Sequence, residues 1–207
     1  MNIIAENLGK RFDRNWLFRN LNLNFQRNQS YAITGRNGSG KSTLIQILAG
    51  LSSPNEGKVK YFSNNTEISA DHLYQKLTFT APYQDLIEEL TLEEIIDFHL
   101  TFKKFKNNLS KKDFIKILGL EKASDKKLIY FSSGMKQRVK LGFAMYTESE
   151  ILFLDEPTVN LDAAGINWYK TEILQNIKDR IVIICSNQPY EYDFCHDIIK
   201  VEDFHKS

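Results

Sequence analysis

The sequence predicts an α/β fold with a mixed sheet, in which parallel strands form the centre and antiparallel strands lie near the N-terminus. The ranges 31–34, 151–154 and 181–185 are short, nearly continuous apolar runs, which is typical of parallel strands covered on both faces. The range 21–25 instead alternates apolar and polar residues, as a strand with one exposed face does. Stretches with helical spacing separate these strands, and this alternation indicates the α/β class.

Helical stretches occupy the middle of the chain. Apolar residues recur at helical spacing from 92 to 100, directly behind Thr91, a residue type that caps helix N-termini. The same spacing recurs from 139 to 146. We therefore expect a helical subdomain, about residues 85–145, inserted into a core lobe of strands.

Composition and charge limit the classes of protein that fit. A chain of 207 residues with 42% hydrophobic residues is long enough for one domain, 1–207, with a buried core. Its 27 basic and 26 acidic residues leave a net charge of +1, which argues against nucleic acid as a partner. The sequence contains neither an apolar run long enough to span a membrane nor the apolar stretch of a signal peptide. Because Cys185 and Cys195 show no metal-ligand spacing, we expect reduced thiols and a cytoplasmic location.

The segment GRNGSGKST follows the apolar strand 31–34 and opens a helical run. It has G-x-x-x-x-G-K-[ST] spacing in the strand-to-helix context in which that spacing binds phosphate, so it predicts a P-loop NTPase core. Its glycines let the backbone curl until N–H groups converge on a phosphate. Lys41 would reach the β- and γ-phosphates of ATP, and Ser42 would offer its hydroxyl to Mg²⁺. The expected nucleotide-binding residues of this segment are Gly35, Arg36, Asn37, Gly38, Ser39, Gly40, Lys41, Ser42 and Thr43.

Two adjacent carboxylates, Asp155 and Glu156, follow the apolar run 151–154. Open α/β sheets bind ligands at the C-terminal edge of their parallel strands. Because neighbouring residues on a strand point to opposite faces, we expect the two carboxylates to have different roles. We assign Asp155 to Mg²⁺ and Glu156 to the water that attacks the γ-phosphate.

The segment 131–138, FSSGMKQR, resembles the LSGGQ signature and trailing QR of ATP-binding cassette (ABC) ATPases. The segment 159–162, VNLD, is similar to the D-loop that follows the catalytic glutamate in that family. The phosphate loop, signature, Asp-Glu strand and D-loop occur in the family's order and together span nearly the whole chain. On these motifs the chain is identified as a member of the ABC ATPases, which act as subunits of transporters.

This resemblance implies ATP hydrolysis in a homodimer of two cassettes packed head to tail. ATP on the phosphate loop of one copy would be capped by Ser132 and Gly134 of the other, and Asp162 would contact the opposite phosphate loop. Glu156 and Lys41 would act in catalysis, with charge spread over Mg²⁺ and the signature. Transmembrane permease subunits would use the opening and closing of the dimer for transport, with the ATPase on the cytoplasmic face of the inner membrane.

Further residues are assigned by their position in the family pattern. Phe12 matches the aromatic residue that stacks on adenine, with Trp16 as a weaker competitor. Gln84 is the candidate for the Q-loop glutamine at Mg²⁺ and nucleotide, but the preceding residues 81–83 depart from the family, and an ordinary loop glutamine is the alternative. Asn187 replaces the family's switch histidine. An amide donates a hydrogen bond but carries no positive charge, so we expect slower or differently regulated hydrolysis.

The direction of transport and the role in the cell leave alternatives. The chain continues only briefly past the strand expected at 198–201, without the C-terminal extension of many import ATPases, so we expect export. The tetrad 186–189, SNQP, resembles one found in the ATPase of the cytochrome c biogenesis haem exporter. The alternative is a soluble, non-transport ABC ATPase that uses the ATP-driven dimer as a nucleotide switch. Co-purification with membranes would distinguish the two.

Overall fold

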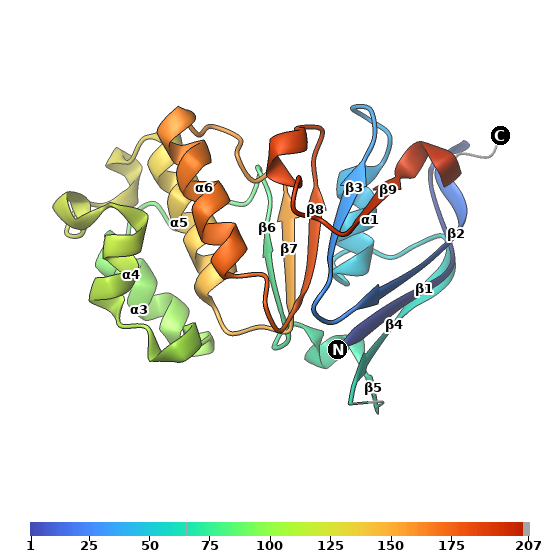
Figure 1. Ribbon diagram of the computed structural model, residues 1–207, viewed down its shortest axis with the longest axis horizontal. Coiled ribbons are helices and arrows are strands. Elements are labelled where there is room, and N and C mark those ends of the chain that lie inside the picture. Colours follow the sequence, from blue (N-terminus) through green and yellow to red (C-terminus); the bar gives the residue numbers. More distant parts are fainter. Residues whose placement is uncertain (65, 205–207) are drawn as a thin grey trace. The chain divides into compact units, whose positions relative to one another are not determined.

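The chain divides into two compact units in the computed structural model, which describes residues 1–64 and 66–204 (Figure 1). The strand unit comprises 1–79, 149–156 and 177–207, and the helical unit comprises 80–148 and 157–176. Both units are therefore assembled from stretches that are separated in the sequence.

A sheet of mainly parallel strands forms the centre of the strand unit. Its strands are β3 (Ser30–Thr34), β6 (Leu77–Thr80), β7 (Ile151–Asp155), β8 (Ile181–Cys185) and β9 (Asp197–Lys200). They lie in the order β6-β7-β8-β3-β9, and the β7–β8, β8–β3 and β3–β9 pairs are parallel. Every residue of β7 and β8 is buried, as the continuous apolar runs predicted.

The N-terminal strands form a second, antiparallel sheet in the same unit. They are β1 (Asn2–Phe12), β2 (Asn15–Gln26), β4 (Glu56–Ser63) and β5 (Thr66–Ile68), in the order β2-β1-β4-β5. The predicted α/β class, with parallel and antiparallel strands, is confirmed. The difference is that the two kinds of strand form separate sheets, because β1 is paired with β2 on one edge and with β4 on the other.

Helix α1 (Lys41–Leu48) shares one core with both sheets. It buries Leu44 and Ile45 in a cluster that contains Phe25 from the antiparallel sheet and Ile183 from the parallel sheet. The rings of Phe25 and Tyr31 meet edge to face, with centroids 4.8 Å apart. This packing fixes the helix end at which the phosphate loop arrives. The remaining helical segments of the unit are α2 (Ala70–Leu73) and the 3₁₀ turns Pro189–Glu191 and Val201–Phe204.

The helical unit contains α3 (Leu92–Phe102), α4 (Lys111–Leu118), α5 (Ser133–Tyr146) and α6 (Ala163–Gln175), with 3₁₀ turns at Lys106–Asn108, Glu121–Ala123 and Leu128–Tyr130. Helix α3 begins as its sequence predicted. The Thr91 hydroxyl accepts from the N–H of Glu94, and the Glu94 carboxylate accepts from the N–H of Thr91, which completes a capping box. The predicted helical lobe ended near residue 145, whereas the helical unit also takes in 157–176.

Close approach between α4 and α5 depends on Gly142. A Cβ atom at this position would lie 2.5 Å from Cδ2 of Leu118 and 3.0 Å from the ring of Phe114. The ring of Phe114 in turn stacks on those of Phe105 and Phe143, with centroids 4.4 and 5.4 Å apart. Since α5 begins at the signature segment, this packing positions the helix that carries the signature.

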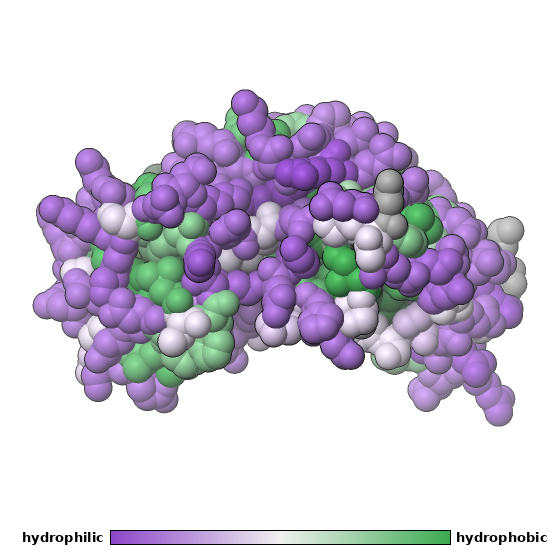
Figure 2. Space-filling model, turned by 90° about the horizontal axis from the view of Figure 1, so that it is seen from below, coloured by the Kyte–Doolittle hydropathy of each residue, from purple (hydrophilic) through white to green (hydrophobic). Residues whose placement is uncertain are grey.

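Apolar side chains also reach the surface of the helical unit. On α3, Phe98, Leu100 and Phe102 are exposed, and the rings of Phe98 and Phe102 meet edge to face at 5.3 Å. Figure 2 shows hydrophobic residues gathered on this unit, at the left, among hydrophilic side chains. None of the helices in the described part of the chain has the length and apolar character needed to cross a membrane.

Stability should depend on pH through His99 on α3. Its ring stacks on Phe143 at 4.4 Å and hydrogen-bonds the Thr147 hydroxyl at 2.7 Å, and burial together with nearby Lys103 lowers its pKa to about 4. An unfolded histidine has a pKa of about 6.5. Between that pH and about 4, the unfolded chain therefore binds a proton at this residue and the folded chain does not. The contribution of His99 to the free energy of unfolding is therefore expected to fall by on the order of 2 kcal/mol as pH drops from about 6.5 to 4.

Urea unfolding of His99→Gln and His72→Gln across this pH range checks the expectation. Between about pH 6.5 and 4 the free energy of unfolding of the His99 variant should fall by on the order of 2 kcal/mol less than that of wild type, whereas the variant of the exposed His72 is the matched control and should follow wild type. Equal slopes for the two variants would contradict the assignment to His99.

Candidate functional site

The N-terminus of α1 is open to an anion. Its N-cap is Gly40, at φ 100° and ψ 10°, and within the described residues no side chain caps this end. Only glycine adopts that conformation without strain, and a Cβ there would also press on Leu17 at 3.2 Å. The first turn contains no acidic residue, so its free N–H groups and the positive end of the helix dipole face the phosphate loop unopposed.

Lys41 is held inside the loop that precedes it. The residue is 5% exposed, and its Nζ donates to the carbonyl oxygens of Gly35 at 2.7 Å and Arg36 at 3.3 Å. These hydrogen bonds compensate for the burial of the ammonium group and hold it beside the backbone of Gly35 and Arg36. The ammonium therefore lies in the curl of the loop, where the sequence predicted that it would meet phosphate.

Asp155 ends β7 in the same unit and is 4% exposed. Burial raises the pKa of its carboxyl to about 6, and repulsion from Glu156 adds to this, while a hydrogen bond from Ser42 opposes it. Among the residues that the structure describes, Asp155 Oδ1 has no hydrogen-bond partner. A buried carboxylate oxygen without a partner beside a serine hydroxyl is a donor set that suits Mg²⁺. The structure thus brings together Ser42 and Asp155, two of the three predicted metal ligands.

Glu156 adopts a left-handed backbone conformation, with φ 45°. Its N–H donates to the carbonyl oxygen of Cys185 at 2.8 Å, which ties the turn to the end of β8. Strand β7 ends at Asp155, so strand alternation does not separate the two carboxylates as we expected. Non-glycine residues held at positive φ are strained and cluster at functional sites.

Asn187 contacts the phosphate loop directly. Its Nδ2 donates to Oδ1 of Asn37 at 2.8 Å. The preceding residue, Ser186, is tied to the core through its N–H, which donates to the carbonyl oxygen of Ile33. The residue in the switch position is thus bonded to the loop that it would act beside, a contact that the sequence did not predict.

Phe12 and Trp16 differ in how their rings are occupied. Phe12 ends β1 and is 55% exposed, with the Lys10 ammonium 5.5 Å from its ring centroid. The ring of Trp16 carries two guanidinium groups, those of Arg19 at 4.5 Å and Arg11 at 5.4 Å. Phe12 therefore carries one cation where Trp16 carries two, and its role in stacking on adenine stays a prediction.

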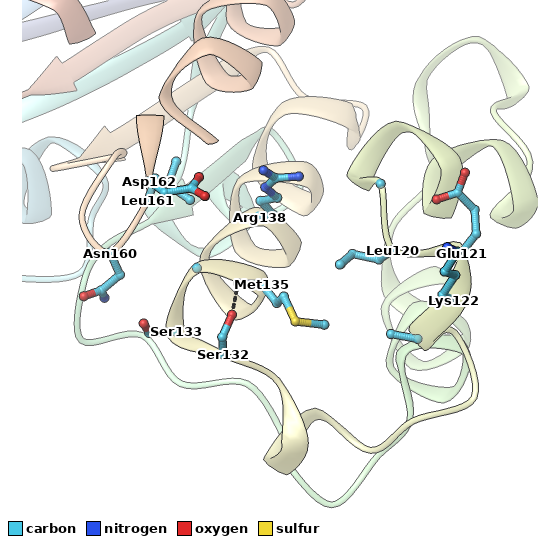
Figure 3. Close-up of a pocket in the computed structure, with 13 residues that line it drawn as sticks. Leu120, Glu121, Lys122, Ser132, Ser133, Met135, Arg138, Asn160, Leu161 and Asp162 are labelled. Atoms are coloured by element: carbon cyan, nitrogen blue, oxygen red, sulfur yellow. Dashed lines mark hydrogen bonds between the residues drawn. The ribbon is translucent and has the colours of Figure 1, made fainter. Parts of the chain in front are cut away.

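The signature segment borders a hollow in the helical unit (Figure 3). The hollow has a volume of about 680 Å³ and is lined by Ser132–Met135, by Arg138 and by the segments 119–123 and 160–162. The Ser132 hydroxyl caps α5 by accepting from the N–H of Met135 at 3.2 Å, the bond drawn in Figure 3. At Gly134, a Cβ would lie 3.0 Å from the carbonyl oxygen of Asn160, so the signature and the D-loop segment approach closely within this unit.

Asp162 and Gln84 both belong to the helical unit. Asp162 is the N-cap of α6, and its Oδ1 accepts from the N–H of Gly165 at 2.7 Å. Its carboxylate therefore has a structural role within its own chain that the sequence analysis did not anticipate. Gln84 is exposed at a turn in which its N–H donates to the carbonyl oxygen of Ala81. Its place as a third metal ligand stays a prediction.

A family model described as ABC transporter matches residues 18–159. The matched range contains the phosphate loop, the signature and both carboxylates, and it covers more than half of the chain. The chain belongs to the ABC transporter family. It is the ATP-binding subunit of an ABC transporter, and ABC ATPases bind ATP with Mg²⁺ and hydrolyse it.

Two ABC relatives match more than nine-tenths of the chain. It is 33% identical over 209 residues to the probable sulfate/thiosulfate import ATP-binding protein CysA of Chlorella vulgaris, covering 98% of this chain and 88% of the relative. It is 30% identical over 193 residues to the cytochrome c biogenesis ATP-binding export protein CcmA of Rhizobium etli, covering 91% and 89%. Among solved structures, the dimeric post-hydrolysis state of the ATP-binding cassette MJ0796 bound to ADP and Pi has a TM-score of 0.76 at 25% identity, covering 96% and 93%.

Sequence analysis missed two carboxylates beside the ABC nucleotide site. Glu191 is 2% exposed, and its charge contributes to the raised pKa of Asp155. Glu202 accepts a hydrogen bond from the N–H of Arg36 in the phosphate loop. Both residues lie outside the motifs. The signal that could have found Glu202 was the expected strand 198–201, whose end must meet the same sheet edge as the phosphate loop.

Proposed function

We propose that this ABC subunit hydrolyses ATP at the interface of a head-to-tail homodimer and drives export through separate transmembrane permease subunits, from the cytoplasmic face of the membrane. One observation carries the proposal. The uncapped N-terminus of α1, the ammonium of Lys41 and the unpartnered carboxylate oxygen of Asp155 belong to one compact unit. Together they supply the cation, the N–H groups and the metal-binding oxygen that a nucleoside triphosphate requires.

Each residue of this site has a role that follows from its chemistry. Lys41 would exchange its carbonyl partners for the β- and γ-phosphate oxygens. Ser42 and Asp155 would hold Mg²⁺, with Gln84 as a further ligand, and the metal would neutralise charge on the phosphates. Glu156 would orient the attacking water, and Asn187 would donate a hydrogen bond to the γ-phosphate. Phe12 would stack on adenine.

The signature supports the dimer. Ser132 and Gly134 lie at the N-terminus of α5, where the helix dipole favours an anion, and Ser132 is exposed. The hydroxyl oxygen of Ser132 accepts from Met135, so its proton is available to donate to a γ-phosphate bound by a second copy. The hollow beside it offers room for the opposing phosphate loop.

Membrane partners and direction rest on two further features. The exposed Phe98 and Phe102 supply apolar surface of the kind that a partner subunit covers. Export is proposed on the tetrad 186–189 alone, because the relatives include both an import and an export ATP-binding protein. Purification from detergent-solubilised membranes should recover the chain with a membrane subunit, whereas a non-transport nucleotide switch would be recovered without one.

The dimer is tested by light scattering coupled to size-exclusion chromatography, with Mg²⁺ and either ATP or ADP. We expect Glu156→Gln to elute at the mass of a dimer in ATP and of a monomer in ADP, because the variant binds ATP without hydrolysing it. Wild type should return to monomer as ATP is consumed.

The control for this experiment is Glu148→Gln. It makes the same chemical change at an exposed glutamate outside the proposed site and should behave as wild type does. If Glu156→Gln remains a monomer at saturating ATP, the proposed ATP-bound homodimer is wrong.

A further inference from the structure

The register of two parallel strands brings the C-terminal segment beside the phosphate loop. In the β3–β9 pair, Thr34 lies opposite Lys200, and each is the last residue of its strand. Two residues further on, the chain reaches Arg36 on one side and Glu202 on the other. Neighbouring Val201 is fully buried in the strand unit, which anchors the turn that presents Glu202.

The Glu202 carboxylate hydrogen-bonds the loop backbone. Its Oε1 accepts from the backbone N–H of Arg36 at 2.5 Å. Both residues belong to the strand unit, so the contact lies within one compact body.

This bond acts on the same peptide group that holds Lys41. The peptide between Gly35 and Arg36 donates its N–H to Glu202 and offers its carbonyl oxygen to Lys41 Nζ at 2.7 Å. In a trans peptide these two groups point in opposite directions. The peptide plane is therefore clamped between a carboxylate and an ammonium group, and each bond polarises the peptide in the sense that strengthens the other.

Gly35 is constrained by the same carboxylate. Its φ is 149°, in the region that favours glycine, and a Cβ there would lie 2.5 Å from Oε2 of Glu202. A side chain at position 35 would therefore clash with the Glu202 carboxylate, and the close approach of the two segments requires glycine there.

We propose that Glu202 is a positioning residue for the phosphate loop: by fixing the Gly35–Arg36 peptide it holds the loop and Lys41 ready for the phosphates of a nucleotide. This inference rests on the proposed function of the loop as the ATP site. When the loop is already ordered, nucleotide binding carries a smaller free-energy cost for ordering it. The effect of Glu202 is therefore expected on nucleotide affinity rather than on the rate of the chemical step.

A purely electrostatic role predicts the opposite sign. A negative charge next to the loop repels the phosphates, so its removal alone would strengthen nucleotide binding. The two roles are separated by Glu202→Gln, because the glutamine amide keeps an oxygen that can accept the Arg36 N–H and loses only the charge. Glu202→Ala loses both.

The experiment compares wild type, Glu202→Ala, Glu202→Gln and Asp203→Ala. Dissociation constants are measured with a fluorescent ATP analogue and Mg²⁺, alongside steady-state hydrolysis and thermal unfolding. For Glu202→Ala we expect Kd and KM to rise about tenfold with kcat changed by less than about twofold. Glu202→Gln should lie within about threefold of wild type. Asp203→Ala removes an exposed carboxylate from the same turn and should match wild type.

Each other outcome overturns the inference in its own way. Tighter nucleotide binding in both Glu202 variants would show a charge effect. Wild-type Kd in Glu202→Ala would show that the contact does not prepare the loop. A lowered melting temperature in both Glu202 variants with unchanged Kd would show a structural role only. If wild type itself failed to bind the analogue, that result would contradict both the proposed ATP site and the inference about Glu202.

Discussion

Replacing Glu156 by glutamine is expected to slow ATP hydrolysis by about a hundredfold or more, because a group that orients or deprotonates an attacking water contributes about 10²–10⁴-fold. The neutral amide keeps the shape of the side chain and loses the base. Nucleotide affinity should remain close to wild type, since Lys41 and the open helix end are unchanged. Phosphate release under steady-state and single-turnover conditions measures the effect.

The left-handed backbone at Glu156 provides a second variant with a sharper result. Glycine accepts φ 45° without the strain of about 1–2 kcal/mol that other residues bear there, so Glu156→Gly should fold at least as well as wild type. We expect it to be as inactive as Glu156→Gln. Unchanged thermal stability with lost hydrolysis would place the effect in the carboxylate, whereas full activity in the glycine variant would contradict its assigned role.

The variant Asn187→His is expected to hydrolyse ATP about tenfold faster than wild type, since a charge-assisted hydrogen bond is roughly twice as strong as a neutral one. The imidazole is longer than the amide and can carry a positive charge toward the γ-phosphate. Asn187→Ala should lose activity by a similar factor. Turnover at saturating ATP is the measurement, and equal turnover in all three proteins would mean that this position does not limit the reaction.

Because Asn187 hydrogen-bonds Asn37, a change in turnover at Asn187 could come from the loop instead of from the γ-phosphate. If Asn187 acts only by bracing the loop, its replacement should have no further effect once Asn37 is alanine. If it acts on the phosphate, the effect of Asn187→Ala should persist in that background. A double-mutant cycle over these two residues separates the roles.

Much of the fold was predictable because burial leaves a strong mark on sequence. The continuous apolar runs located β7 and β8, and Thr91 before residues at helical spacing located the start of α3. Helix α6 was not predicted. It begins at an aspartate in a motif that was interpreted for its function, and its apolar positions are mixed with polar ones.

The candidate site likewise has a part that the sequence predicted and a part that it did not. The phosphate loop was predictable because its conformation depends on local glycine geometry and on neighbours in sequence. The contacts of Glu202 with Arg36 and of Asn187 with Asn37 join residues that are far apart in the chain, so they depend on strand register. The positive φ of Glu156 was likewise hidden, because glutamate gives no sign of it.

The position of β3 has a consequence for the order in which the protein assembles. This strand leads into the phosphate loop near the beginning of the chain, yet its neighbours in the sheet are β8 and β9, which are synthesised only after the entire helical unit. Pairings between such distant segments form slowly, because a large loop must close before any contact is gained. On the ribosome, the nucleotide site is therefore among the last parts of the molecule to form. Until β8 emerges, the apolar faces of β3 and α1 lack their final cover and need protection from aggregation.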